Sequence, residues 1–289
     1  MMITGKTQLL GVMGDPIGHS LSPVMHNRAI AALGVDAVYV AFPVKPADLA
    51  TALAGFAAVD VLGLSVTIPH KQAVIPLLAE VSEVAQAVGA VNTLWRTDRG
   101  WSGTNTDVDG FIAPLRSLRE SWQGATALVL GTGGAARAVI AGAQRLGCDR
   151  VVVAGRDRAK LAALVHHFAP PNPLAIALQT VLWDDLDSVL PTTDLLVNST
   201  PVGMHPLEHD SPLSIGQLAL LPATAVAYDL IYTPRPTRFL QWAADRELRA
   251  IDGLEMLVQQ GAVALTQWLG QPAPIAVMRS SLETFLHHA

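Results

Sequence analysis

The chain has 289 residues, of which 51% are hydrophobic and 15% are charged. This balance excludes intrinsic disorder, which needs low hydrophobicity and high net charge, and it allows one large or two medium domains. A net charge of −5 gives no basic surface for nucleic acid, and no apolar run approaches the roughly 18 residues that span a bilayer. The single cysteine, Cys148, cannot form an internal disulfide. Since the N-terminus also lacks a secretory signal pattern, the sequence predicts a soluble cytoplasmic protein.

The first third of the chain alternates short apolar runs with helix-like segments. A helix is predicted from Pro23 to Leu33, with Ser22 as its N-cap and Pro23 as its first helical residue. An Ala-rich helix at 46–58 and a helix after Pro69 are also predicted. Strands are predicted at 9–13, 37–43 and 61–68. Strands separated by helices indicate a parallel or mixed α/β sheet.

A second group of elements begins near Ala125. It opens with a strand, a glycine cluster, an Ala-rich helix and another strand, which together form a βαβ unit. The predicted elements are strands at 127–130, 150–154, 195–197 and 225–228 and helices at 135–146 and 256–269. The fold class is therefore α/β in this part of the chain as well.

The turn after the first of these strands, at 131–136, has the pattern G-x-G-x-x-G/A. Gly131 permits the tight turn, Gly133 lets a pyrophosphate approach the backbone, and Ala136 allows close packing of helix on strand. The start of the helix offers free N–H groups and the positive end of the helix dipole. The pattern indicates a dinucleotide site; the alternative is a glycine turn without a ligand.

The end of the next strand bears on the choice of cofactor. NAD sites usually have a carboxylate there, about 20 residues after the glycines, that binds the ribose hydroxyls. This strand ends without an acidic residue and is followed by Arg156, whose guanidinium can hold the 2′-phosphate of NADP. Asp157 argues against this interpretation if it pairs with Arg156 or repels the phosphate. NADP is predicted, with NAD as the weaker alternative and an ordinary surface position for Arg156 left open.

Polar segments within apolar surroundings are candidates for substrate binding. Ser20 and Ser22 flank a predicted helix start, which suits a carboxylate, although N-capping also explains Ser22. Lys71 follows a strand end, where α/β sheets bind ligands, and could be a general acid–base or a solvated lysine. Asn92 could bind a substrate hydroxyl or form a turn, and Asp107 could cap a helix or pair with Lys71. No cluster has metal-ligand spacing, so no metal is predicted.

Seven motifs, in one order along nearly the whole chain, resemble those of the shikimate dehydrogenase family. They lie at 14–16 with 20–23, 66–71, 105–107, 131–135, 198–204, 228–232 and 252–262. The resemblance implies reversible NADPH-dependent reduction of 3-dehydroshikimate to shikimate, on the route to chorismate and aromatic amino acids. It also implies a substrate domain at 1–106, a Rossmann-like NADP-binding domain at 107–252, and C-terminal helices at 253–289 that return to the substrate domain.

The resemblance implies a role for individual residues. Lys71 and Asp107 would be the catalytic acid–base pair, and both would also bind substrate. The other substrate-binding residues would be Ser20, Ser22, Thr67, Asn92, Tyr232 and Gln260. The cofactor-binding residues would be Gly131, Gly133, Gly134, Ala135, Arg156, Thr200, Leu230, Gly253 and Met256. Of these, Leu230, Gly253 and Met256 would lie near the nicotinamide.

The chain departs from the family's common pattern at two places. Ser65 stands where Asn is common, and Gly155-Arg156-Asp157 stands where Asn-Arg-Thr is common. Two other functions stay open: a quinate or dual quinate/shikimate dehydrogenase, and a non-catalytic sensor of a shikimate-type ligand. The expected partner is a small-molecule substrate, without nucleic acid or membrane, and the protein is expected to be a monomer or homodimer.

Overall fold

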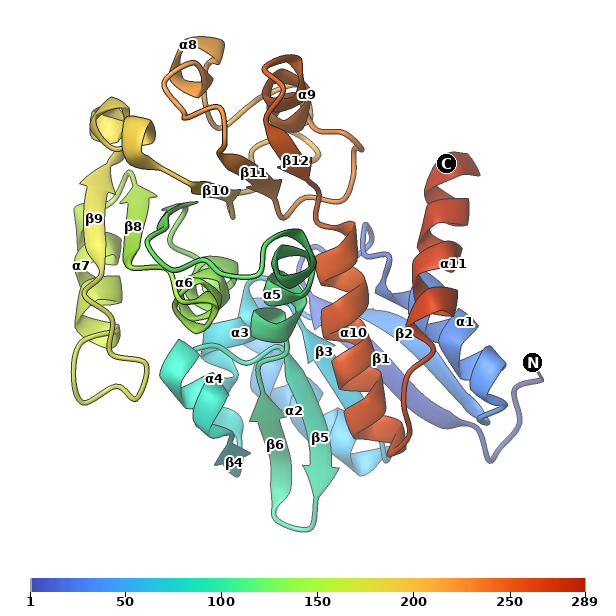
Figure 1. The fold of residues 1–289 in the computed structure, drawn as a ribbon. Helices are drawn as coiled ribbons and strands as arrows, with labels where there is room; N and C mark the ends of the chain where they lie inside the picture. The colour runs from blue at the N-terminus through green and yellow to red at the C-terminus, as the bar shows by residue number, and fades with distance from the viewer. Residues whose placement is uncertain (1, 289) are drawn as a thin grey trace. The chain divides into compact units, whose positions relative to one another are not determined.

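The computed structural model describes residues 2–288, which form two compact units. The first unit runs to Gly110 and resumes at Leu257, and the second comprises Phe111–Met256. The sequence analysis drew the domain boundaries after residues 106 and 252, four residues before each of these positions. Figure 1 shows both units as combinations of a β-sheet and surrounding helices.

The first unit contains a six-stranded mixed sheet in the order β2-β1-β3-β5-β6-β4. β1 lies between β2 and β3 and is parallel to both, whereas β5 is antiparallel to β3 and β6. The strands are β1 (Gln8–Gly14), β2 (Ala37–Pro43), β3 (Gly63–Val66), β4 (Glu80–Val81), β5 (Thr93–Thr97) and β6 (Gly100–Thr104). The three predicted strands are present, and the β5–β6 hairpin is an addition that the sequence pattern did not indicate.

Helices cover both faces of this sheet. Alternation along β3 points Leu64 and Val66 into a core with α2, while Gly63 faces α10. Trp268 of α10 packs on Gly63 and donates its indole N–H to the carbonyl of Leu94 at 2.8 Å. The helical elements of this unit are α1 (Ser22–Leu33), η1 (Pro46–Asp48), α2 (Leu49–Ala58), α3 (His70–Ala73), η2 (Ile75–Leu77), α4 (Glu83–Val88), α10 (Leu254–Leu269) and α11 (Ile275–His288). Figure 1 shows α11 lying beside α1.

The start of α1 corrects one prediction. The N-cap is Leu21, with no side-chain capping bond, and Ser22 and Pro23 are the first two helical residues. Predicting Ser22 as the N-cap was therefore wrong by one position. The helix starts earlier because a proline is tolerated anywhere in the first turn, where its missing N–H has no intrahelical partner. The backbone N–H of Ser22 instead donates to the Oγ of Ser20 at 3.3 Å.

The second unit contains a six-stranded sheet in the order β12-β11-β10-β7-β8-β9, parallel throughout. The chain runs outward from β7 through β8 to β9 and then returns to form β10 on the other side of β7. The carboxyl ends of β7 and β10 therefore mark the topological switch point, where such sheets bind ligands. The strands are β7 (Thr126–Leu130), β8 (Arg150–Gly155), β9 (Gln179–Leu182), β10 (Leu195–Asn198), β11 (Val226–Asp229) and β12 (Arg249–Ile251). This is a Rossmann-like arrangement.

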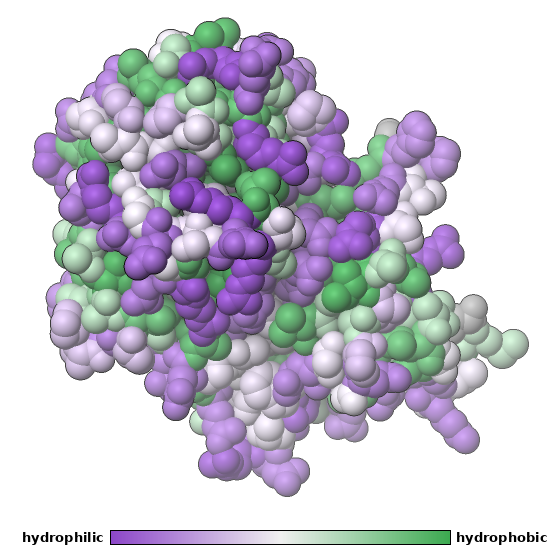
Figure 2. Space-filling view, in the orientation of Figure 1, coloured by the Kyte–Doolittle hydropathy of each residue, from purple (hydrophilic) through white to green (hydrophobic). Residues whose placement is uncertain are grey.

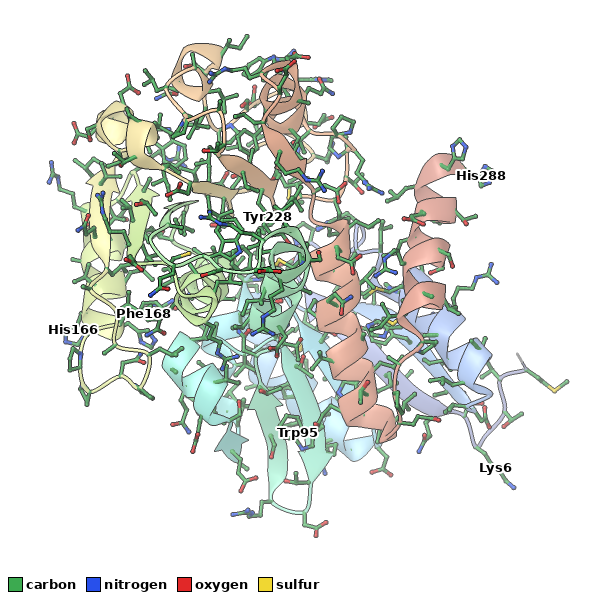
Figure 3. All side chains as sticks on the ribbon, in the orientation of Figure 1. Lys6, Trp95, His166, Phe168, Tyr228 and His288 are labelled. Carbon is green, nitrogen blue, oxygen red and sulfur yellow. The ribbon has the colours of Figure 1, made fainter. Side chains whose placement is uncertain are left out.

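Aromatic and glycine contacts fix the helices on this second sheet. Phe111 packs on Gly142 and stacks on Tyr228, with ring centroids 5.4 Å apart, on one face. Figure 3 labels Tyr228 among the side chains of this unit. On the other face, Leu218 and Phe239 join a core made with residues of β7, β8, β10 and β11. The helical elements are α5 (Asp107–Leu118), which begins in the first unit, α6 (Gly134–Leu146), α7 (Arg158–His167), η3 (Trp183–Ser188), η4 (Leu190–Thr192), α8 (Ile215–Leu218) and α9 (Arg238–Asp245).

The surface in Figure 2 mixes hydrophilic and apolar residues. Within residues 2–288, none of the helices combines the length and the apolar character that a membrane crossing requires.

Candidate active site

An ion pair links the two residues predicted to be catalytic. Lys71 lies in the single turn of α3, shortly after β3, and its Nζ is 2.6 Å from Oδ2 of Asp107, the first residue of α5. The side chains are 15% and 7% exposed, so the pair is largely withdrawn from water. An ammonium–carboxylate hydrogen bond of this length is charge-assisted, and it holds Lys71 in one position while leaving its other two N–H groups available.

Asn92 connects this pair to neighbouring polar groups. Its Nδ2 donates to Oδ1 of Asp107 at 2.8 Å and to Oγ1 of Thr106 at 2.9 Å, and lies 3.4 Å from Oε1 of Gln260. Its Oδ1 accepts the backbone N–H of Thr106 at 2.8 Å, which fixes the orientation of the amide. Four of the predicted substrate residues, Lys71, Asn92, Asp107 and Gln260, therefore meet within the first unit.

Thr106 belongs to the same cluster, although the sequence analysis assigned it no role. It is 1% exposed, and its hydroxyl lies between the side chains of Asn92 and Thr93. A signal was present in the sequence, because Thr106 is the middle residue of the polar run Asn105-Thr106-Asp107. The sequence does not show which of these three side chains meets Lys71, because that depends on the fold.

Ser65, one of the two departures from the common family pattern, has a partner in this structure. Its Oγ accepts the phenolic O–H of Tyr39 at 2.8 Å, and both side chains are buried. Burial raises the pKa of Tyr39, so the phenol stays protonated and remains a donor. A tyrosine–serine hydrogen bond thus occupies the position where an asparagine is common, which the sequence analysis did not predict.

The remaining predicted substrate residues lie in both units. Ser20 and Thr67 follow the carboxyl ends of β1 and β3 and are partly exposed, and the Thr67 methyl packs on Gly14. Ser22 is buried at the start of α1. Tyr232 belongs to the second unit, and its contact with substrate stays a prediction.

The glycine turn at the carboxyl end of β7 fits a bound pyrophosphate. Gly131 has a φ of 112°, which favours glycine, and a Cβ there would lie 2.9 Å from Oγ of Ser199. A Cβ on Gly133 would meet nothing within 4 Å, so the space beside the backbone is open. Gly133 also caps α6 without a side-chain hydrogen bond, and the first turn carries no acidic residue. The N–H groups at the start of α6, including those of Gly134 and Ala135, are thus available for an anion.

The loop after β8 gives Asp157 a role that the sequence analysis did not consider. Its Oδ1 accepts the backbone N–H groups of Ala159 at 2.8 Å and Lys160 at 3.2 Å, so Asp157 is the N-cap of α7. Arg156, just before it, is exposed. The carboxylate is engaged with the helix start, and no described salt bridge joins it to the arginine.

Other predicted cofactor residues lie in loops that follow β10, β11 and β12. Thr200 donates its hydroxyl to Oδ1 of Asn198 at 2.7 Å. Gly253 donates its N–H to the carbonyl of Ile231 at 3.0 Å, and a Cβ on Gly253 would lie 2.0 Å from the carbonyl oxygen of Leu230. Only glycine permits this backbone approach, which brings two predicted residues together. Met256, in the first turn of α10, is buried.

No group of three His, Cys, Asp or Glu side chains within the described residues 2–288 could hold a metal ion.

Comparison with known proteins agrees with this arrangement. Residues 12–94 match the profile of the shikimate dehydrogenase substrate binding domain, and residues 253–283 match that of the shikimate 5'-dehydrogenase C-terminal domain. The shikimate dehydrogenase (NADP(+)) of Synechocystis is 58% identical over 286 residues, covering 99% of this chain and 97% of the relative. The chain belongs to the shikimate dehydrogenase family.

Solved structures of this family share the whole fold. Shikimate dehydrogenase from Aquifex aeolicus is 36% identical, with a TM-score of 0.87 over 97% of this chain and 99% of the other. Shikimate 5-dehydrogenase from Thermus thermophilus, in complex with NADP(H) and shikimate, is 34% identical, with a TM-score of 0.83 over 96% and 99%. The fold class predicted from the sequence, an α/β substrate domain with C-terminal helices and a Rossmann-like NADP-binding domain, is confirmed.

Proposed function

We propose that this protein catalyses the reversible, NADPH-dependent reduction of 3-dehydroshikimate to shikimate. The observation that carries the proposal is the largely buried Lys71–Asp107 ion pair, 2.6 Å long, inside a set of amide and hydroxyl groups. Membership of the shikimate dehydrogenase family supports the same reaction. A ligand sensor would not need an acid–base pair, so the enzyme accounts better for these residues.

Lys71 handles the proton in this reaction. When a carbonyl is reduced, hydride adds to carbon and the developing alkoxide oxygen takes one proton. The Lys71 ammonium gives that proton, and in the reverse direction neutral Lys71 removes it from the hydroxyl. Asp107 holds Lys71 in place and balances its charge, while Asn92 fixes Asp107 through the 2.8 Å hydrogen bond.

The remaining substrate residues bind and orient. Ser20 and Ser22 bind the carboxylate through their hydroxyl groups, which lie just before and at the first residue of α1. Thr67, Asn92 and Gln260 bind the ring hydroxyls, together with Tyr232.

The second unit holds NADP. When bound, NADP(H) accepts or supplies the hydride. Gly131, Gly133 and the start of α6, with Gly134 and Ala135, hold the pyrophosphate, and Arg156 holds the 2′-phosphate, because no strand-end carboxylate opposes it. Thr200, Leu230, Gly253 and Met256 line the remainder of the cofactor site. The Asp157 carboxylate is tied to the start of α7, which favours NADP over NAD.

The enzyme acts in the cytoplasm as a monomer or homodimer. A single cysteine, which needs no oxidising compartment, supports the cytoplasm. Size-exclusion chromatography with light scattering distinguishes the two oligomeric states.

A spectrophotometric assay of NADPH formation tests the activity. Shikimate with NADP should give a high initial rate, and shikimate with NAD or quinate with NADP a low one. Lys71→Met should reduce turnover by about 10²- to 10⁴-fold, the usual contribution of a general acid–base, and leave NADPH binding unchanged.

Lys6→Met, at an exposed position, is the matched control for loss of one lysine charge and should retain the wild-type rate. Absence of shikimate-dependent NADP reduction by the wild-type protein contradicts the proposed function. Near-normal turnover of Lys71→Met contradicts the role of Lys71.

A further inference from the structure

A fully buried carboxylate ends β11, and no role has yet been given to it. Asp229 is 0% exposed. Its Oδ1 accepts from Nδ2 of Asn198 at 2.9 Å and from the N–H of Ile231 at 3.1 Å, and its Oδ2 accepts from the hydroxyl of Thr237 at 2.7 Å. Burying a carboxylate is costly unless hydrogen bonds compensate, and here three donors from three separate segments converge on it. Burial raises the pKa of Asp229 to about 7, and the three donors oppose that rise.

One branch of this network leads to the loop after β10. Because Nδ2 of Asn198 faces Asp229, its Oδ1 must face the other way, where it accepts the N–H of Thr200 at 3.1 Å and the Thr200 hydroxyl at 2.7 Å. A flipped amide would turn its oxygen towards the Asp229 carboxylate, so that two acceptors face each other, and would turn its NH₂ towards the N–H of Thr200, so that this hydrogen bond is lost. Asp229 thus sets the orientation of Asn198 together with the carbonyl of Val202, which accepts from the same Nδ2 at 3.1 Å, and Asn198 sets the position of Thr200.

A second branch leads to the loops after β11 and β12. The N–H of Ile231 is held by Asp229, and the carbonyl of Ile231 accepts the N–H of Gly253 at 3.0 Å. Gly253 in turn lies against the carbonyl of Leu230. Gly253 is therefore joined to the Asp229 side chain through two hydrogen bonds by way of Ile231, and it packs against Leu230, the residue after Asp229.

We propose that Asp229 is a positioning residue for the cofactor, which fixes Thr200, Leu230 and Gly253 relative to one another so that the nicotinamide half of NADP is held in one orientation. This inference rests on the proposed function. Asp229 acts through Asn198 and Ile231 and needs no contact with the cofactor. The adenosine half depends instead on Gly131 to Ala135 and Arg156, none of which bonds to Asp229.

The variant Asp229→Asn separates this role from folding. If its amide NH₂ faces Thr237, the threonine hydroxyl can reverse and act as acceptor, so the side chain still fits. The remaining oxygen still faces Asn198 and Ile231 but is neutral, and a hydrogen bond to a neutral acceptor is about half as strong as one to a charge. The variant should therefore fold while its hold on both loops weakens.

The test measures binding of two probes to the purified protein by titration calorimetry. NADPH carries the nicotinamide half, whereas adenosine 2′,5′-bisphosphate carries only the adenosine half. For Asp229→Asn the Kd of NADPH should rise by roughly tenfold, in line with weakened charge-assisted bonds, and that of adenosine 2′,5′-bisphosphate by less than about twofold. Asn198→Ser, which cuts the branch to Thr200, should raise the Kd of NADPH selectively as well. It supplies the same test if Asp229→Asn fails to fold.

Thr237→Val is the matched control. It removes one hydrogen bond to Asp229 and the N-cap of α9 but leaves both branches, so it should lower the melting temperature without separating the two Kd values. A parallel loss of both probes in Asp229→Asn, or no loss of NADPH, overturns the positioning role. Wild-type protein that fails to bind NADPH overturns the proposed function itself and this inference with it.

Discussion

Replacing His26 should change how the stability of the first unit depends on pH. The imidazole is 0% exposed, stacks on Tyr39 with centroids 4.2 Å apart, and lies 5.7 Å from the Trp268 ring. Neither ring nitrogen has a hydrogen-bond partner among the described residues. Burial without a partner disfavours the charged form and lowers the pKa of His26 from 6.5 to about 3. The folded state therefore keeps His26 neutral in a range where the unfolded chain is protonated.

The size of the effect follows from proton linkage. Above pH 6.5 His26 is neutral in both states and does not lower the free energy of unfolding. As the pH falls through 6.5 towards 3, the unfolded state binds a proton that the folded state does not, so the free energy of unfolding decreases. Between pH 7 and pH 5 the loss amounts to ~2 kcal/mol. His26→Phe keeps an aromatic ring for the stack but cannot titrate, so relative to wild type it should gain ~2 kcal/mol over this interval.

Urea unfolding at pH 5, 6 and 7, followed by circular dichroism, measures that difference. The free energy of unfolding of the wild type must be subtracted from that of the variant at each pH, because Asp229 changes this free energy with pH in the opposite sense. Its pKa is raised from 3.8 to about 7, so its contribution to stability falls as the pH rises through that range. A pH-independent difference between His26→Phe and wild type would refute the reasoning, because it would mean that the folded protein accommodates the imidazolium.

Two further pairs of variants test packing and cofactor choice. Gly63→Ala should destabilise the protein by ~1–3 kcal/mol through overpacking, since its Cβ would lie 2.2 Å from the indole nitrogen of Trp268. Gly55 lies on the exposed side of α2, where an added Cβ would meet nothing within 4 Å, so Gly55→Ala should stabilise the protein by about 1 kcal/mol. Thermal unfolding compares the two variants, and equal melting temperatures would contradict the packing argument. Arg156→Gln should raise the KM for NADPH about tenfold or more and leave that for NADH unchanged, as expected from loss of a charge-assisted phosphate contact. Asp157→Ala should cost about 1 kcal/mol as a lost N-cap without changing the NADPH/NADH preference, and a shift in that preference would show that its carboxylate acts on the phosphate.

Elements with strong local signals could be predicted from the sequence. β2 at Ala37–Pro43 was predicted with its observed bounds. The βαβ unit around α6 differs from its prediction by one residue at three of its six ends and matches it at the other three. The hairpin of β5 and β6 was missed, because glycines and polar residues interrupt its alternation and its pairing comes from the neighbouring strands. Ser22 was misplaced as an N-cap because helix starts are uncertain by a residue when a proline follows.

The sequence by itself determined the α/β class, the glycine turn at Gly131 and the residue types needed for proton and hydride transfer. These depend on local periodicity and on short motifs, which are properties of contiguous residues. Only the tertiary structure decided that Lys71 meets Asp107, that Tyr39 bonds to Ser65, and that Asp157 caps a helix. Hydrogen bonds and ion pairs of this kind join side chains to groups whose distances and directions are set by packing, and packing depends on the whole chain.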